Sequence, residues 1–114
     1  MRLTTLITTI ILVIGIVIAG SATNVLSTVW IIHPASVKVT GANEIAGLSN
    51  VNWSLIKPGD ELIIKGNEGA YQESFTITMQ GTASAPVVIR AADGETPVIN
   101  GSVVVSNSSY VTIK

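Results

Sequence analysis

Three basic side chains close three similar strand-like phrases and could bind an anionic polymer. The phrases are 62–65, 87–90 and 111–114, and each reads aliphatic residue, β-prone residue, Ile, cation. Their cations, Lys65, Arg90 and Lys114, follow one another at offsets of 25 and 24 residues. If the phrases are neighbouring strands about 4.8 Å apart, the cations form a ladder that would attract an anionic polysaccharide. Like charges in register repel, so an intact ladder needs a compensating partner. The alternative is an ordinary solvated face.

The remaining chemistry-bearing residues give no catalytic or metal-binding pattern. His33 is the only histidine, and without clustered carboxylates in the sequence we expect it to pack at the surface or at a sheet edge. Two carboxylate pairs, Asp60 with Glu61 and Asp93 with Glu95, fall in turns, where aspartate is common for backbone reasons, so we expect solvated turn acids. The sequence has no Ser-His-Asp set, no phosphate-binding glycine loop and no Cys/His metal spacing. We therefore assign no catalytic residue and no metal ligand.

Four aromatic residues are available to stack on sugar rings. They are Trp30, Trp53, Tyr71 and Tyr110. Trp53 lies in a segment expected to pack on the core, whereas Tyr110 precedes an inward-facing Val111 and is expected to face outward.

The near-constant spacing of the phrases predicts a stacked repeat. A period of about 20–50 residues is typical of solenoids, in which each coil pairs only with its neighbours. Further short β-rich runs lie at 29–32, 71–79, 97–99 and 103–105, separated by residues that favour turns. Alternation along these strands predicts the interior residues. They are Leu62, Ile64, Phe75, Ile77, Val87, Ile89, Val98, Val103, Val105, Val111 and Ile113. We expect Ile64, Ile89 and Ile113 to form one aligned column.

A short helix is expected ahead of the first coil. Ile45, Leu48, Val51 and Leu55 are spaced by three, three and four residues, which is helical spacing for one apolar stripe. A helix over 44–56 would cover the apolar end and the unpaired strand edges of the first coil. Lys57-Pro58-Gly59-Asp60 then reads as a tight turn, in which glycine tolerates a positive φ.

The N-terminus reads as a hydrophobic leader. Leu3 to Gly20 is 18 residues without a charge, preceded by Arg2 and followed by small residues. This length lies between a typical signal-peptide core and a membrane-spanning helix. Residues 1–22 are therefore a secretory signal peptide or an N-terminal membrane anchor, 23–29 a linker, and 30–114 the folded part. Either interpretation predicts a secreted or cell-surface location, with membrane contact only through an uncleaved leader.

Composition narrows the choice of partners. Without Arg2, five cations face seven carboxylates, a balance too weakly acidic to imply a charged partner. It argues against nucleic acid, which normally calls for a basic patch. Cysteine is absent, which export permits, so the absence carries no information about compartment.

Three phrases resemble a known superfamily. Lys57 to Leu62 resembles the opening phrase of many right-handed parallel β-helix domains, Gly81 to Arg90 resembles one of their coils, and Pro97 to Ser102 resembles the next phrase. Together, over about residues 30–114, they resemble the N-terminal end of the pectate-lyase-like superfamily, closest to the chondroitinase B and alginate lyase group of polysaccharide lyases. The resemblance implies an all-β, right-handed parallel β-helix whose first two to three coils are present.

The resemblance also implies a function. Lyases of that group use a basic residue to take the proton beside a uronic acid carboxylate, which a cation, often calcium, neutralises. Their catalytic and calcium-binding residues lie on later coils, so none is transferred to this segment, and we expect an incomplete β-helix that is inactive alone. Two functions are expected: part of an exported, carbohydrate-active protein acting on an acidic polysaccharide, or a non-catalytic surface solenoid for adhesion or scaffolding. Lys65, Arg90 and Lys114 are the candidate substrate-binding residues.

Overall fold

A computed structural model describes residues 26–114, so the expected leader at 1–22 lies outside the described residues. No helix within 26–114 is long and apolar enough to cross a membrane. Two 3-10 helices are present, η1 (Leu48–Asn50) and η2 (Trp53–Leu55). The strands are β2 (Val29–His33), β3 (Glu44–Ala46), β4 (Glu61–Ile64), β5 (Phe75–Ile77), β6 (Val87–Ala91), β7 (Val103–Val105) and β8 (Val111–Ile113).

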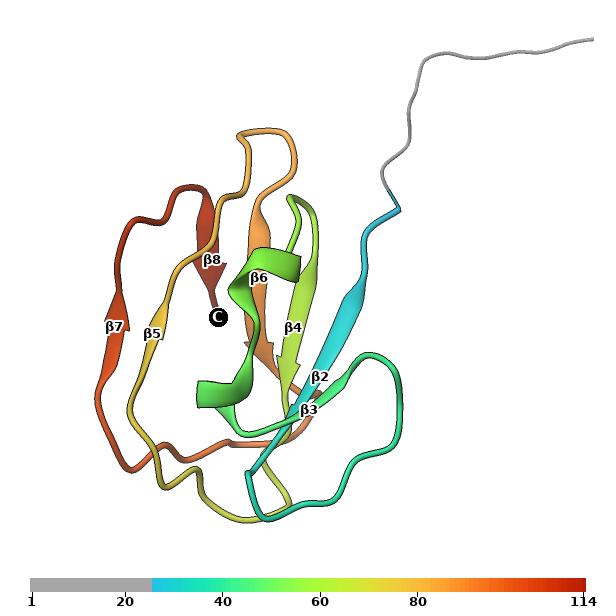
Figure 1. Ribbon diagram of the computed structural model, residues 1–114, viewed down its shortest axis with the longest axis vertical. Coiled ribbons are helices and arrows are strands. Elements are labelled where there is room, and N and C mark those ends of the chain that lie inside the picture. The colour runs from blue at the N-terminus through green and yellow to red at the C-terminus, as the bar shows by residue number, and fades with distance from the viewer. Residues whose placement is uncertain (1–25) are drawn as a thin grey trace, which may run out of the picture.

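All strand pairs are parallel, and they form two sheets. The larger sheet has the order β3-β2-β4-β6-β8, and the smaller one pairs β5 with β7. From β4 onward the chain passes alternately through the two sheets, which stand on opposite sides of the molecule in Figure 1. Parallel neighbours need a long crossover connection, and the crossovers β4→β6 and β6→β8 each contain one strand of the smaller sheet.

The strands of the larger sheet line up side chain by side chain, but not in the predicted register. Leu62 pairs with Ile89, and Ile89 pairs with Ile113. Ile64 instead pairs with Ala91, so the expected column of Ile64, Ile89 and Ile113 is wrong for its first member. The shift is two residues, which leaves Ile64 on the inward face because side chains alternate with a period of two.

The core lies between the two sheets. Six of the predicted interior residues are buried: Leu62, Ile64, Phe75, Ile77, Val87 and Ile89. Six further apolar residues join them: Ile32, Leu48, Val51, Ile56, Tyr71 and Met79. The 3-10 helices and their flanking turns thus supply interior side chains that strand alternation alone does not predict.

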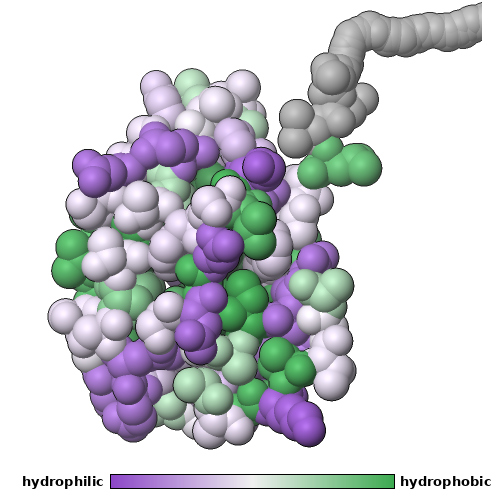
Figure 2. All heavy atoms as spheres, viewed as in Figure 1, coloured by the Kyte–Doolittle hydropathy of each residue, from purple (hydrophilic) through white to green (hydrophobic). Residues whose placement is uncertain are grey.

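The remaining predicted interior residues are not buried. Val98, Val103, Val105 and Ile113 are exposed, and Val111 is half-buried. Val103 and Val105 pair with Phe75 and Ile77, so they continue the inward columns, but β7 has no second neighbouring strand. β7 and β8 end the stack within the described residues, whereas β5, which also has one neighbouring strand, is covered on its other side by η1. Apolar residues also reach the surface on the face shown in Figure 2, where they lie among hydrophilic ones.

The helix expected over 44–56 does not form. Ile45 lies in β3 and pairs with Ile32 of β2. Gly47 has a φ of 93°, which interrupts any helix at that point. Two single turns follow, and the Asn52 side chain accepts the backbone N–H of Ser54 at the start of η2. Pairing with the free edge of β2 outweighs the helical spacing because it satisfies backbone groups that would otherwise stay unpaired.

Two expected strands are shorter than predicted. The run 71–79 is a strand only at Phe75–Ile77, and the run 97–99 is not a strand, although Tyr71 and Ile99 form an isolated parallel bridge. The predicted turn at 57–60 is confirmed: Gly59 has a φ of 87°, and the Asp60 N–H donates to the Lys57 carbonyl at 3.0 Å.

Candidate functional site

The candidate site is the outer face of the larger sheet, where the three predicted cations lie. Arg90 lies opposite Ile63, whereas Lys65 lies two residues after Ile63, just past the end of β4. Lys114 continues the row of Arg90, since its backbone N–H donates to the Ile89 carbonyl at 2.9 Å. The cations therefore do not stack in one column: Arg90 and Lys114 share a row, and Lys65 is displaced from it.

Two of the three cations, Lys65 and Arg90, are compensated by carboxylates of the chain itself. Lys65 Nζ donates to Glu95 Oε2 at 2.9 Å, and this hydrogen bond raises the pKa of Lys65. Hydrogen bonds from the Gly66 N–H and from Lys65 in turn hold the pKa of Glu95 below its usual range. Arg90 Nε donates to Glu61, which lies diagonally across from it in β4, and this hydrogen bond raises the pKa of Arg90.

The carboxylates around these cations differ in accessibility. The Glu95 side chain is 12% exposed and is also held by the Gly66 N–H at 2.7 Å. Asp93, which accepts from Arg90 Nη1 at 3.0 Å, has a side chain that is 98% exposed. A ligand carboxylate can therefore replace Asp93 on Arg90 far more easily than it can replace Glu95 on Lys65.

His33 ends β2 on the same sheet, and its surroundings differ from those predicted. Its side chain is 10% exposed, with Nδ1 2.7 Å from Glu68 Oε1 and Nε2 3.0 Å from Glu44 Oε1. The sequence predicted ordinary surface or edge packing without clustered carboxylates. Glu44 and Glu68 are 11 and 35 residues away along the chain, so only the pairing of β3 with β2 and the turn after β4 bring them to the ring.

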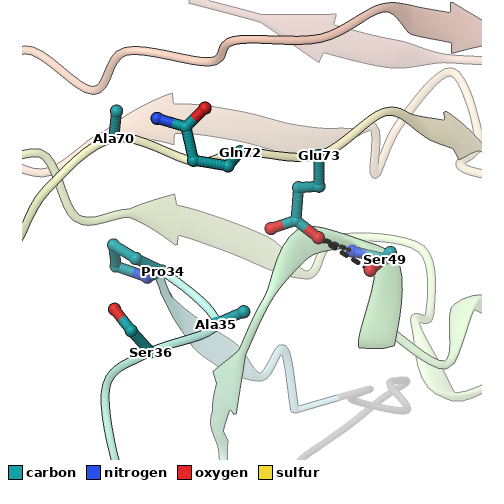
Figure 3. A pocket seen from close by; sticks show the side chains of 7 residues that line it. All are labelled: Pro34, Ala35, Ser36, Ser49, Ala70, Gln72 and Glu73. Atoms are coloured by element: carbon teal, nitrogen blue, oxygen red, sulfur yellow. Dashed lines mark hydrogen bonds between the residues drawn. The ribbon is translucent and has the colours of Figure 1, made fainter.

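A pocket of about 360 Å³ lies beside the segment that follows β2. Figure 3 shows Pro34, Ala35 and Ser36 on one side, Ala70 and Gln72 on the other, and Glu73 turned toward Ser49. The Glu73 carboxylate accepts from the Leu48 N–H at 2.8 Å, the Ser49 N–H at 2.9 Å and Ser49 Oγ at 2.7 Å. The lining holds a carboxylate and no cation, so it suits a neutral polar group better than an anion.

Asp60, which we expected to be a solvated turn acid, and Tyr71, which we gave as available for sugar stacking, are both buried. Asp60 is 1% exposed and accepts three hydrogen bonds, which corrects its assignment as a solvated turn acid. Tyr71 is fully buried, and its hydroxyl lies 2.9 Å from the Ile32 carbonyl and 2.7 Å from that of Lys65, so it cannot stack on a sugar. Trp53 packs against the core and Tyr110 is exposed, both as predicted.

Within residues 26–114 no three His, Asp or Glu side chains gather in a way that could hold a metal ion. No protein-family model, curated protein or solved structure matches this chain.

Proposed function

We propose that this chain is part of an exported, carbohydrate-active, right-handed parallel β-helix protein of the polysaccharide lyase-like kind. Its role here is to bind an acidic polysaccharide across the outer face of the larger sheet, through Lys65, Arg90 and Lys114. The support is the resemblance of three sequence phrases to the pectate-lyase-like superfamily, together with parallel strands that alternate between two sheets. A row of strands about 4.8 Å apart gives a long polymer a regular series of contacts.

The observation that carries the proposal is the environment of Arg90. Its guanidinium is oriented by Glu61 within the sheet, and its other partner, Asp93, is almost fully exposed. Arginine presents planar donors that match a carboxylate, so a uronate group can take the position of Asp93 while Glu61 keeps the arginine in place. Lys114 follows in the same row, and no ion pair involves it within the described part of the chain.

The role proposed for these residues is binding rather than catalysis. Proton abstraction beside a uronate needs a base that is free to accept a proton at working pH. Within residues 26–114, both ring nitrogens of the one histidine face carboxylates, and Lys65 is held by Glu95.

The test measures affinity for a polyuronate and for a neutral glucan by calorimetry, using the full chain. We expect Arg90→Ala to weaken polyuronate binding about tenfold. Asp93→Asn should strengthen it several-fold, because it removes the competing carboxylate. Lys38→Ala is the matched control, since Lys38 is an exposed cation in the loop between β2 and β3 and should leave affinity unchanged. No binding by the wild type, or equal weakening by Lys38→Ala, would refute the proposal.

A second function is favoured by a specific observation. Lys65 and Arg90 are already neutralised by carboxylates of the same chain, as expected of a self-sufficient solvent-facing sheet. This favours a non-catalytic surface solenoid used for adhesion or scaffolding. The two functions differ in the Asp93→Asn experiment: a scaffold gains no affinity for polyuronate from that change, whereas a polysaccharide-binding face does.

A further inference from the structure

Both ring nitrogens of His33 lie within hydrogen-bond distance of a carboxylate, and the two hydrogen bonds together require a doubly protonated ring. Nδ1 lies 2.7 Å from Glu68 Oε1, and Nε2 lies 3.0 Å from Glu44 Oε1. An ionised carboxylate only accepts hydrogen bonds, so both ring nitrogens must donate, and only the imidazolium carries two N–H groups. A neutral ring supports one of these bonds and turns a lone pair toward the other carboxylate.

The two carboxylates belong to two short segments beside the end of β2. Glu44 opens β3, which has three residues and lies at the edge of the larger sheet with β2 as its one neighbour. Glu68 lies in the turn between β4 and Tyr71. β3 pairs with β2 over three residues, so the bond between His33 and Glu44 adds a side-chain link to a short ladder.

Other charged and titratable groups lie near the segments that carry Glu44 and Glu68. Lys65 is bonded to Glu95 and interacts favourably with Glu68. The Tyr71 hydroxyl donates toward the Ile32 and Lys65 carbonyls, and Glu68, Glu73 and Glu95 all disfavour its ionised form. Glu73 is already held by Leu48 and Ser49, and Glu95 by Gly66 and Lys65. Neither of these acids therefore replaces Glu44 or Glu68 at the ring.

We propose that His33 is a proton-controlled latch that fastens β3 and the 66–69 turn to the end of β2. Histidine is the side chain whose charge ordinarily changes between about pH 5 and 8. Deprotonation breaks one of the two bonds and leaves a carboxylate facing a lone pair. The consequence is a loosened β3, together with the 34–36 segment that directly follows His33 and forms one wall of the pocket.

The test follows ring protonation and local opening separately, on the full 114-residue chain labelled with ¹⁵N. Ring nitrogen shifts report when His33 changes from imidazolium to neutral. Amide exchange, corrected for intrinsic rate, reports the opening of β3 through the Gly47 N–H, which donates to the His33 carbonyl at 2.7 Å. We expect protection of residues 45–47 to fall about tenfold or more over the same pH range as the ring titration. Protection of β6, which is remote from the ring in the sheet order, should not change.

Glu68→Gln is the informative variant. A glutamine side chain can donate to a bare ring nitrogen or accept from a protonated one, so both contacts persist in either state. The pH step in β3 protection should therefore disappear while the protein stays folded. Glu95→Gln, which leaves both contacts of the ring intact, should keep the step. A neutral His33 at pH 6 with full β3 protection, or a step that persists in Glu68→Gln, would overturn the proposal.

Discussion

The indole Nε1 of Trp30 donates a hydrogen bond of 3.1 Å to Oδ2 of Asp60, although the two residues are 30 positions apart in the chain. Asp60 also accepts the backbone N–H of Thr28 and of Lys57, each at 2.9 Å. One buried carboxylate thus joins the start of β2 to the turn that leads into β4. Asp60 therefore links two neighbouring strands of the larger sheet through the hydrogen bonds of its side chain.

Removing this carboxylate should strongly destabilise the fold. Asp60→Ala leaves three N–H donors without their acceptor in a site that is 1% exposed. We expect a loss of about 3 kcal/mol in the free energy of unfolding, measured by urea denaturation. Asp93→Ala is the control because its side chain is 98% exposed, and it should change stability by less than about 0.5 kcal/mol. Equal effects of the two substitutions would contradict the role given to Asp60.

The buried phenol of Tyr71 predicts a loss of stability in alkali. Burial, and then the nearby charges of Glu68 and Glu73, raise the pKa of Tyr71 above its ordinary value of 10.0. The folded state therefore keeps the proton that the unfolded chain releases, so stability should fall as pH rises above about 10. Tyr71→Phe should flatten this fall, at a cost of about 1 kcal/mol at pH 7 for the lost hydrogen bonds. Denaturation of both proteins from pH 8 to 11 tests this, with Tyr110→Phe as the exposed comparison.

The lowered pKa of Glu73 predicts a loss of stability in acid. Burial raises the pKa of Glu73, but the hydrogen bonds from Ser49 and Leu48 outweigh it and set the pKa below the usual 4.5. The folded state thus stays ionised where the unfolded chain takes up a proton, so this contribution is present above pH 4.5 and is lost as pH falls. Ser49→Ala should shift the acid unfolding midpoint upward. A midpoint that does not move would show that the Ser49 hydroxyl does not set the acid behaviour of Glu73.

A steric prediction concerns Gly66, which follows β4. A Cβ built there would lie 2.6 Å from the Pro97 nitrogen and 2.7 Å from backbone atoms of Thr96. Backbone cannot move aside as a flexible side chain can, so Gly66→Ala should cost about 1–3 kcal/mol. Gly94→Ala should cost about 1 kcal/mol, because that site has open space and only a positive φ of 74°. Thermal denaturation of the two variants tests this order. A larger loss of stability in Gly94→Ala than in Gly66→Ala would contradict the steric role of Gly66.

Much of the strand pattern could be predicted from the sequence. The segments that became β2, β4, β6, β7 and β8 lie where aliphatic and β-branched runs are bounded by turn residues. The turn at 57–60 followed from Pro58 and Gly59 alone. These features are local, because propensity and turn chemistry act over a few residues.

The burial of Asp60, Tyr71 and His33 could not be predicted in this way. Each side chain meets partners that are distant in sequence: Trp30 for Asp60, Ile32 for Tyr71, and Glu68 for His33. The sequence contains no local signal for such contacts. The helix expected over 44–56 failed for a related reason, since Ile45 finds a partner strand in β2 that periodicity does not describe.

The sequence by itself determined which face of each strand is apolar, and the tertiary structure decided the register between strands. A slip of one residue would turn every inward side chain outward, so alternation excludes it. A slip of two residues keeps every side chain on its face, so the hydrophobic pattern cannot detect it. Leu62 therefore meets Ile89 at a distance of 27 residues, whereas Ile89 meets Ile113 after 24. The length and packing of each crossover set these two intervals, and with them the positions of Lys65, Arg90 and Lys114 on the sheet.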